Sequence, residues 1–318
     1  MLTEVRQTEA KLPVFRRWMI YQRERFPLLG HGPLVAAFSL SAVCFSSLLR
    51  GHFAFPKLPT LLVAFFGSLF FFLQLRIADE FKDAGEDAEY RPYRPVPRGL
   101  VSLHQLGTLG AMSAIAQFGL TCWLCPPLVF WLLLTWTYLG LMSKEFFVGR
   151  WLRAHPFTYL WTHMLIMPLI DVYTSGCDWL PAGAALPSGL KWFLIASFFN
   201  GMVIEVGRKI RAPEMEERGV QTYTVIWGRR GAVIGWLIAM VLTLGSALIA
   251  ASCIGFMPMI SWILGTLLVM SLMLSLKFLS EPTKRYARLF EPLSGVWTLL
   301  LYLGLGVLPM LVRSGRLL

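Results

Sequence analysis

Long apolar runs constrain the fold of this chain more than any other feature of its sequence. Each run is close to the ~20 residues that a helix needs to cross the apolar core of a bilayer. The runs predict helices at residues 33–50, 58–78, 101–122, 125–143, 155–175, 186–206, 231–254, 257–279 and 290–312. Hydrophobic residues make up 56% of the 318 residues and charged residues only 15%, which is not the balance of a soluble domain. We therefore predict an all-α, polytopic membrane protein with about nine transmembrane helices.

The basic residues fall almost entirely on one side of these helices. If the N-terminus is cytoplasmic, 24 of the 29 Lys and Arg residues lie on the cytoplasmic side. The other side keeps Arg50, Lys57, Lys191, Arg313 and Arg316. Because Lys and Arg accumulate in cytoplasmic loops, this distribution predicts a cytoplasmic N-terminus and explains the net charge of +11 without a nucleic acid partner. We expect a multi-pass protein, in the inner or plasma membrane of a bacterium.

The first 30 residues differ in character from the rest of the chain. They are polar and basic, and they lack the apolar core of a cleavable signal peptide. Residues 13–30 mix arginines with aromatic and aliphatic residues, which predicts an amphipathic helix on the anionic inner leaflet. We expect residues 1–30 to form a cytoplasmic or interfacial segment and residues 31–318 to form a single transmembrane domain.

The five cysteines give little indication of metal or redox chemistry. Cys122 and Cys125 form a CxxC pair, but no second pair accompanies them. Four of the cysteines lie in or beside apolar runs, so we expect them to act as small hydrophobic side chains.

A charged stretch follows directly on the second apolar run. Asp79, Asp83 and Asp87 are spaced four residues apart in it. If the helix continues past the membrane, successive carboxylates share one face, about 6 Å apart along the axis. Their repulsion favours a bound cation, and hard oxygen ligands suit Mg²⁺, which commonly bridges to phosphate. The spacing therefore indicates a Mg²⁺ site, and a solvated, salt-bridged loop is the alternative interpretation.

Basic residues follow the three aspartates at once. Arg91, Arg94 and Arg98 lie in a Pro-rich run that ends at Gly99, and the prolines stiffen it. Arginine side chains pair well with phosphate oxygens. Carboxylates that hold metal ions and arginines that meet phosphate oxygens together suit a diphosphate ligand.

This stretch resembles the first of two Asp-rich cytoplasmic loops in the UbiA superfamily of membrane prenyltransferases. The family's loop reads approximately NxxxDxxxD and is followed by an Arg-Pro-x-Pro-x-Gly run. Here Asp79 stands at the Asn position, Asp83 and Asp87 stand at the Asp positions, and Arg94-Pro-Val-Pro-Arg-Gly99 matches the run. The resemblance implies nine helices around a central cavity, with Mg²⁺-dependent binding of an isoprenyl diphosphate and transfer of its prenyl group. It implies catalytic roles for Asp83 and Asp87, metal binding by Asp79, Asp83 and Asp87, and diphosphate binding by Arg91 and Arg94.

The loop after the sixth predicted helix is similar to the family's second Asp-rich loop only in part. It contains Gly219-Val-Gln-Thr222 and Gly228, which fit the end of the family motif. The aspartates are missing, because Glu205 stands near the first aspartate position and Lys209 falls four residues later.

This departure leaves several interpretations of the second loop. Glu205 can still ligate a metal ion, whereas a protonated Lys209 cannot. Arg208 and Lys209 instead suit the diphosphate, in place of a second ion. The alternatives are a metal ligand from Glu214 or Glu216, and an inactive or repurposed second motif.

Three ionisable residues outside the two loops are further candidates. Lys144 closes the fourth predicted helix on the cytoplasmic side, where the family resemblance implies a basic catalytic residue against the diphosphate. A positive-inside anchor is the alternative for Lys144. His163 and Asp171 lie in the fifth apolar run, where ionisable groups are costly and usually face a cavity or a partner. A polar contact between helices is the favoured interpretation of both, and acceptor binding or proton removal is the alternative.

Taken with the resemblance, these features predict an enzyme that moves a prenyl group from an isoprenyl diphosphate to an aromatic or lipid acceptor, with Mg²⁺ as cofactor. Its partners would be the diphosphate donor, a hydrophobic acceptor and membrane lipids, with no nucleic acid. Two alternatives stay open: a terpene cyclase of the same family, and a noncatalytic isoprenoid-diphosphate binder or transporter. A transporter usually has ionisable residues spread near the midplane, whereas the charges here concentrate at the inner surface.

Overall fold

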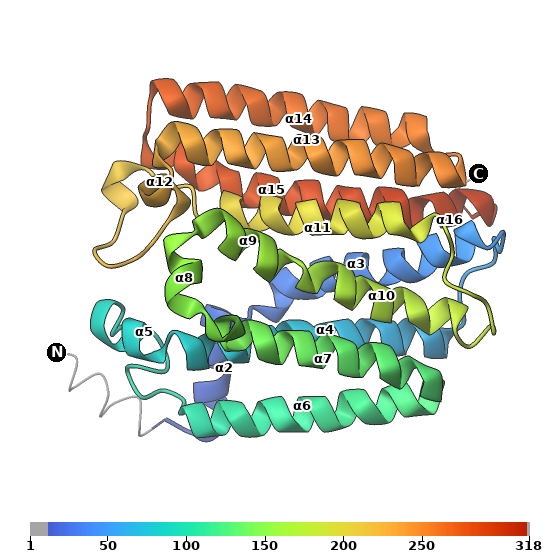
Figure 1. Ribbon diagram of the computed structural model, residues 1–318, viewed down its shortest axis with the longest axis horizontal. Coiled ribbons are helices and arrows are strands. Elements are labelled where there is room, and N and C mark those ends of the chain that lie inside the picture. The colour runs from blue at the N-terminus through green and yellow to red at the C-terminus, as the bar shows by residue number, and fades with distance from the viewer. Residues whose placement is uncertain (1–11, 317–318) are drawn as a thin grey trace.

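The computed structural model describes residues 12–316, which contain helices and no strand. The longer helices run roughly parallel to one another along the longest axis of the molecule (Figure 1). They are α2 (Val14–Arg25), α3 (Leu28–Leu49), α4 (Leu58–Lys82), α5 (Ala84–Tyr90), α6 (Leu103–Leu124), α7 (Val129–Ser143), α8 (Gly149–Ala154), α9 (Pro156–Met164), α10 (Ile166–Trp179), α11 (Leu190–Gly207), α12 (Tyr223–Ile226), α13 (Gly228–Ile254), α14 (Met257–Ser280), α15 (Lys284–Leu305) and α16 (Val307–Arg313). Three short 3-10 turns accompany them, η1 (Pro126–Leu128), η2 (Glu145–Phe147) and η3 (Pro213–Met215). The predicted all-α fold is confirmed.

Seven helical segments among the described residues are long and apolar enough to cross a membrane. They are Leu28–Leu49, Leu58–Lys82, Pro126–Ser143, Leu190–Gly207, Gly228–Ile254, Met257–Ser280 and Lys284–Arg313. The other two predicted spans are α6 and the pair α9–α10. Helix α6 carries the buried polar residues Ser113, Gln117 and Thr121, which make it less apolar. Helices α9 and α10 have 9 and 14 residues, so neither is long enough to cross alone.

Proline divides two of the predicted spans. A proline ring clashes with the carbonyl group four residues before it and donates no backbone hydrogen bond. Pro168 lies four residues after Met164, where α9 ends, and Pro309 lies four residues after Leu305, where α15 ends. The fifth and ninth predicted helices are therefore the broken pairs α9–α10 and α15–α16.

Helix α3 lies in the centre of the bundle and packs against α4, α10 and α15. Its residues Val43 and Phe45 are fully buried, and Phe45 stacks on Phe193 of α11 with ring centroids 5.0 Å apart. At Gly306 a Cβ would lie only 2.3 Å from the Cα of Ser41, so glycine permits this close approach of two backbones. Within a bilayer such tight packing, rather than hydrophobic burial, holds helices together.

A buried polar network joins α4, α6 and α7. The Gln74 amide donates to Gln117 Oε1 at 3.0 Å, and the Trp136 indole donates to Gln74 Oε1 at 3.0 Å. Gln117 in turn donates to the carbonyl oxygen of Gly67 at 2.9 Å. Since an unpaired polar group in hydrocarbon costs several kcal/mol, this mutual pairing lets α6 keep its polar residues at membrane depth.

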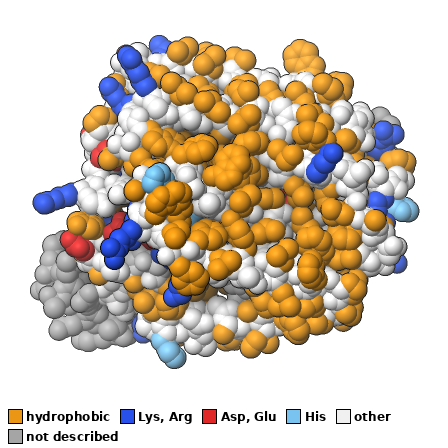
Figure 2. Space-filling model, viewed as in Figure 1, with side chains coloured by type: hydrophobic (Ala, Val, Ile, Leu, Met, Phe, Trp, Pro, Cys, Tyr) orange, Lys and Arg blue, Asp and Glu red, His pale blue; other side chains and the backbone are white. Residues whose placement is uncertain are grey.

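Charged side chains gather at the ends of the bundle. Figure 2 shows hydrophobic side chains over the broad middle of one face, with most of the visible Lys and Arg side chains towards the end that carries α5, α8 and α12. The predicted amphipathic segment 13–30 contains α2, which lies across the same end (Figure 1). The first 11 residues of the predicted N-terminal segment lie outside the described residues.

Candidate functional site

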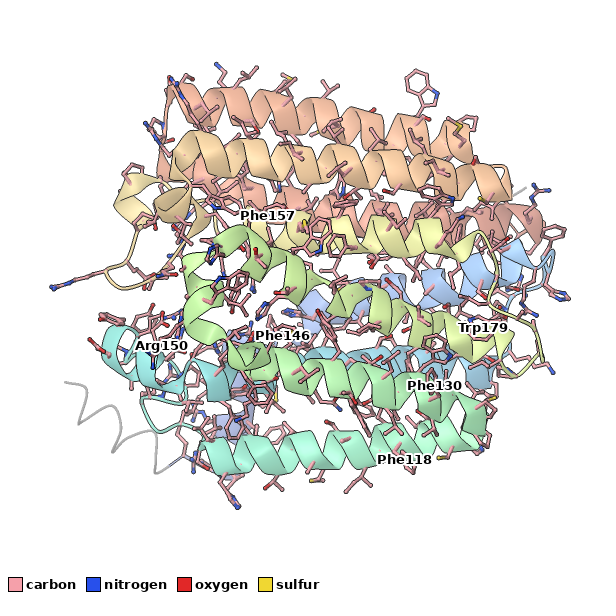
Figure 3. All side chains as sticks on the ribbon, in the orientation of Figure 1. Phe118, Phe130, Phe146, Arg150, Phe157 and Trp179 are labelled. Atoms are coloured by element: carbon pink, nitrogen blue, oxygen red, sulfur yellow. The ribbon has the colours of Figure 1, made fainter. Side chains whose placement is uncertain are left out.

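Two connecting segments meet at the end of the bundle that carries most of the basic residues. Loop 1 (residues 83–102) joins α4 to α6 and includes α5, and loop 2 (residues 208–227) joins α11 to α13 and includes α12. Figure 1 places α5 and α12 at the same end, with α8 beside them. Figure 3 labels Arg150 on α8 there and Phe146 close by, whereas Phe130 and Trp179 lie towards the opposite end.

Asp79 and Asp83 stand where α4 ends. Helix α4 continues to Lys82, four residues past its predicted end, and Asp83 caps it before α5 begins. The Asp79 carboxylate is held only loosely, 3.9 Å from Arg76 Nη1 and 3.8 Å from Lys82 Nζ. Among residues 12–316 the partly buried Asp83 side chain has no hydrogen-bond or ion-pair partner. Burial raises the pKa of Asp83 above its usual value, against the opposing effect of the Lys82 ammonium group.

Asp87 is placed differently from the other two aspartates. Its side chain is 2% exposed and is engaged by Arg94 Nη1 at 2.7 Å and Arg91 Nε at 2.9 Å. Within residues 12–316 no three His, Cys, Asp or Glu side chains are grouped as a metal site. The three regularly spaced aspartates therefore do not converge on one point in this conformation, and the two arginines assigned to the diphosphate are paired with Asp87.

The end of α11 carries the corresponding charges of the second segment. Glu205 forms ion pairs with Arg208 and with Lys209, whose Nζ lies 2.7 Å from Glu205 Oε1. The Glu205 carboxylate is the main cause that raises the pKa of Arg208. Lys209 Nζ also lies 5.6 Å from the ring centroid of Tyr223, at the start of α12. Asp79 contributes to the electrostatic environment of Arg208, so the two segments meet at this point.

Further residues at this meeting point were not singled out from the sequence. Lys82 donates to the hydroxyl of Tyr159 on α9 at 2.9 Å, and Arg76 interacts electrostatically with Arg208. Lys82 could have been predicted from the sequence, because it is adjacent to Asp83. No sequence pattern indicated a role for Tyr159. The region therefore combines the cationic side chains of Arg76, Lys82, Arg208 and Lys209 with the carboxylates of Asp79, Asp83 and Glu205.

The two loops also touch each other over this region. Tyr93 of loop 1 donates its hydroxyl to Glu217 Oε2 of loop 2 at 2.7 Å, and Arg211 Nη1 lies 3.1 Å from the other oxygen of Glu217. The ring of Tyr90 lies directly against Gly219, where a Cβ would come within 2.3 Å of it. The Gly219 φ of 78° also favours glycine. We call these contacts the loop latch (Tyr90, Tyr93, Glu217 and Gly219).

The remaining predicted candidates lie apart from this group of charges or are otherwise engaged. Lys144 caps the end of α7 with an exposed side chain that makes no ion pair within the described residues. Glu214 accepts a hydrogen bond from the backbone of Lys284, and Glu216 accepts from the hydroxyl groups of Thr222 and Thr224.

His163 and Asp171 are both buried, on α9 and α10 respectively. Eight residues separate them, which is about 12 Å of helix rise. His163 interacts electrostatically with Lys82, Glu205 and Asp79, so it faces the charged end of the bundle. Asp171 has no charged residue among its electrostatic neighbours in the described part of the chain.

Comparisons with known proteins point to one family. The family model of the UbiA prenyltransferase family matches residues 37–299. The apo structure of a UbiA homolog from Aeropyrum pernix K1 is similar with a TM-score of 0.64 at 12% identity, over 83% of this chain and 94% of that chain. A structure of digeranylgeranylglyceryl phosphate synthase is similar with a TM-score of 0.53 at 13% identity, over 91% of this chain and 99% of that chain. No curated protein sequence matches, and at such identities the two structural likenesses show the fold alone.

Proposed function

The chain belongs to the UbiA prenyltransferase family, and on that basis we propose that it moves a prenyl group, with Mg²⁺, from an isoprenyl diphosphate to an aromatic or lipid acceptor in the membrane. The observation that carries the proposal is the meeting of charged side chains from the ends of α4 and α11. The segments that follow these two helices are joined by the hydrogen bond from Tyr93 to Glu217, at 2.7 Å. A group of charged side chains at the end of an apolar bundle suits a ligand with a diphosphate head and an apolar chain.

Asp79 and Asp83 are the residues that fit Mg²⁺ best. Asp83 has no side-chain partner within residues 12–316, and Asp79 keeps only long contacts of 3.8 and 3.9 Å. Mg²⁺ keeps several waters and needs only one or two carboxylates, so a pair of oxygen donors is sufficient. When bound, the ion would neutralise charge on the diphosphate leaving group.

Asp87 and Glu205 are proposed ligands whose oxygens are already engaged. Asp87 would have to release Arg91 or Arg94, and Glu205 would have to release Arg208 or Lys209. We propose that a diphosphate drives this exchange, because its oxygens can take over the arginines and free the carboxylates for the metal. The paired state is then the resting state of the site.

The cationic side chains supply the rest of the diphosphate site. Arg76 and Arg208 lie close enough for their like charges to interact. The Nζ atoms of Lys82 and Lys209 lie 5.5 and 5.6 Å from the ring centroids of Tyr159 and Tyr223, respectively. A bound anion relieves this repulsion, and guanidinium groups meet phosphate oxygens in a bidentate manner. These residues favour departure of the diphosphate when the C1–O bond of the donor ionises.

An open apolar groove beside the site suits the prenyl chain. It has a volume of about 260 Å³ and lies on the surface between α4, α6 and α7. It is lined by Gln74, Ile77, Ala78, Gly110, Ala114, Trp136, Leu139 and Gly140. Ala78 directly precedes Asp79, so a chain in this groove can place its diphosphate at the end of α4.

The test is turnover of radiolabelled prenyl diphosphates, from geranyl to geranylgeranyl, by purified protein in vesicles of a total membrane lipid extract. We expect Mg²⁺-dependent release of diphosphate and a labelled lipid product, and we expect Asp83→Ala to abolish both. Release that survives Asp83→Ala would refute the proposed site. A labelled cyclic hydrocarbon without acceptor would instead show a cyclase, and donor binding without turnover would show a noncatalytic binder.

A further inference from the structure

We propose that His163 is the base that takes the proton of the acceptor, and that the acceptor attacks through a hydroxyl group. The inference rests on the proposed prenyl transfer and adds a residue and a substrate class to it. It comes from three observations on the His163 ring: a fixed tautomer, a buried nitrogen without a partner, and charged neighbours from both segments of the site.

The backbone of α9 fixes the tautomer of His163. Its Nδ1 lies 2.8 Å from the carbonyl oxygen of Tyr159. A carbonyl oxygen only accepts hydrogen bonds, so Nδ1 carries the hydrogen and Nε2 of the neutral ring carries a lone pair. The ring is further held by stacking on Tyr159, with centroids 3.9 Å apart and planes 14° apart. Phe146 packs edge-on against it at 6.3 Å.

The lone pair on Nε2 has no partner among the described residues. His163 is 8% exposed, and Nε2 itself is buried without a hydrogen bond. A buried polar atom without a partner is rare in folded proteins and calls for an explanation such as a ligand. Only a donor can satisfy this atom.

The charged groups around His163 identify the ligand's location. Lys82 and Asp79 act on the ring from α4, and Glu205 acts on it from α11. Lys82 is also bound to the hydroxyl of Tyr159, the residue on which His163 stacks. The ring therefore lies beside the proposed diphosphate site, on the wall formed by α9 and by η2, which carries Phe146. Figure 3 shows Phe146 at this end of the bundle.

The chemistry of Nε2 excludes the other groups of the reaction. A neutral ring with its hydrogen on Nδ1 cannot donate to a phosphate oxygen, and Mg²⁺ prefers oxygen ligands. A C–H group does not satisfy a buried lone pair, whereas an O–H group does. The hydroxyl of a phenol or an alcohol on the acceptor is therefore the partner that fits.

The transfer step balances with His163 as base. The acceptor oxygen attacks C1 of the prenyl chain while its O–H bond breaks, and the proton moves to Nε2. The electron pair of the O–H bond stays on the oxygen as a new O–C1 bond forms, and the electron pair of the C1–O bond leaves with the diphosphate. Burial and the Lys82 ammonium group disfavour the imidazolium, so its proton passes on to the released diphosphate.

The experiment compares His163→Gln with wild-type protein in vesicles of the total lipid extract, using the tritiated prenyl diphosphate that the wild type turns over best. Donor binding and product formation are measured separately. We expect the donor Kd to stay within about threefold and product formation to fall about 100-fold, which is typical for loss of a general base. We also expect the wild-type product to carry the prenyl group on oxygen.

His155 provides a matched control. Its ring stacks on Trp151 four residues earlier, and its Nδ1 lies 2.8 Å from the Trp151 carbonyl oxygen, so its local geometry is similar to that of His163. His155 is exposed, so His155→Gln should keep wild-type product formation. As a second variant, His163→Ala should regain at least about tenfold in rate with added imidazole, which a purely structural residue would not do.

The outcomes separate this inference from the proposed function. Wild-type turnover together with full activity of His163→Gln overturns the base but leaves prenyl transfer intact. Equal loss of donor binding and product formation in both His163 variants, without rescue by imidazole, shows a structural role and also overturns it. A product with the prenyl group on carbon overturns the hydroxyl acceptor. A wild type that makes no product with any donor overturns the proposed function and this inference together.

Discussion

At the residue scale, carboxylates that look equivalent in the sequence differ in their partners. The spacing of Asp79, Asp83 and Asp87 predicted a row of metal ligands, yet only the first two stand free of strong ion pairs. Asp87 pairs with Arg91, four residues later, and that spacing is favourable within a helical segment. Spacing along the chain locates the charges, but which charges pair depends on where the helix stops. Here it stops at Asp83.

A buried ion pair attaches α2 to α4. Arg25 Nε lies 2.5 Å from Glu80 Oε1, and the Glu80 side chain is 1% exposed. We expect Arg25→Ala to lower the stability by about 3–5 kcal/mol, because it leaves a buried carboxylate without its partner. Thermal unfolding in detergent measures this. The double variant Arg25→Met with Glu80→Gln should recover most of the loss, and a single variant as stable as wild type would show that the pair contributes nothing.

At the element scale, prolines in the sequence indicate where two apolar runs are broken into separate helices. Hydropathy averaged over a long window does not resolve these breaks. The preceding helices end four residues before Pro168 and Pro309, where the proline ring would clash, whereas α15 accommodates Pro292 in its interior. No pattern foretold the turn after α7, where Glu145, Phe146 and Phe147 all have positive φ. Such strained backbone depends on the packing around it, which a sequence window does not contain.

The loop latch makes a prediction about two glycines. Gly219→Ala adds a Cβ that would lie 2.3 Å from the Tyr90 ring, at a position with φ of 78°, so we expect loops 1 and 2 to separate. Limited proteolysis of the two loops should become faster. The control is Gly85→Ala, because Gly85 lies in helix α5 and has nothing within 4 Å of its added Cβ. Equal protease sensitivity of both variants would contradict a latch.

The latch should also respond to pH. The hydrogen bond from Tyr93 holds the pKa of Glu217 below its usual value of 4.5. A depressed carboxyl pKa means that the contact contributes its full stability above the usual value and loses it as the pH falls through the depressed one. We expect the protection of loops 1 and 2 against hydrogen exchange, relative to the intrinsic exchange rate at each pH, to fall as the pH drops below about 4.5. Tyr93→Phe should weaken this dependence, because only the Arg211 contact of Glu217 then remains, and an unchanged dependence in that variant would rule out the Tyr93 hydrogen bond as its main cause.

At the scale of the whole molecule, the sequence predicted the helical class, the family and the gathering of charge at one end. Family membership is confirmed over residues 37–299. These features are distributed over the chain, so single errors in helix boundaries do not affect them. The contact of loop 1 with loop 2 could be expected only from the resemblance, because Tyr93 and Glu217 lie more than a hundred residues apart.

The sidedness of the charged end is open to direct labelling. In a Cys253→Ser background, which removes an exposed cysteine, we expect Glu86→Cys and Arg218→Cys to react with a membrane-impermeant maleimide only from the cytoplasmic side. Lys57→Cys should react only from outside. Labelling of all three from the same side would contradict the predicted orientation.

The central claim is that loops 1 and 2 and the helix ends before them form one diphosphate site. The most direct measurement is the affinity for a non-hydrolysable prenyl diphosphate analogue, with Mg²⁺, of wild type, Asp83→Asn, Arg208→Gln and the double variant. A single site predicts that each single change weakens binding at least about tenfold. The loss of binding free energy in the double variant should then be much smaller than the sum of the two single losses, since groups that act together are not additive. Wild-type affinity in either single variant, or losses that add fully in the double variant, would contradict the claim.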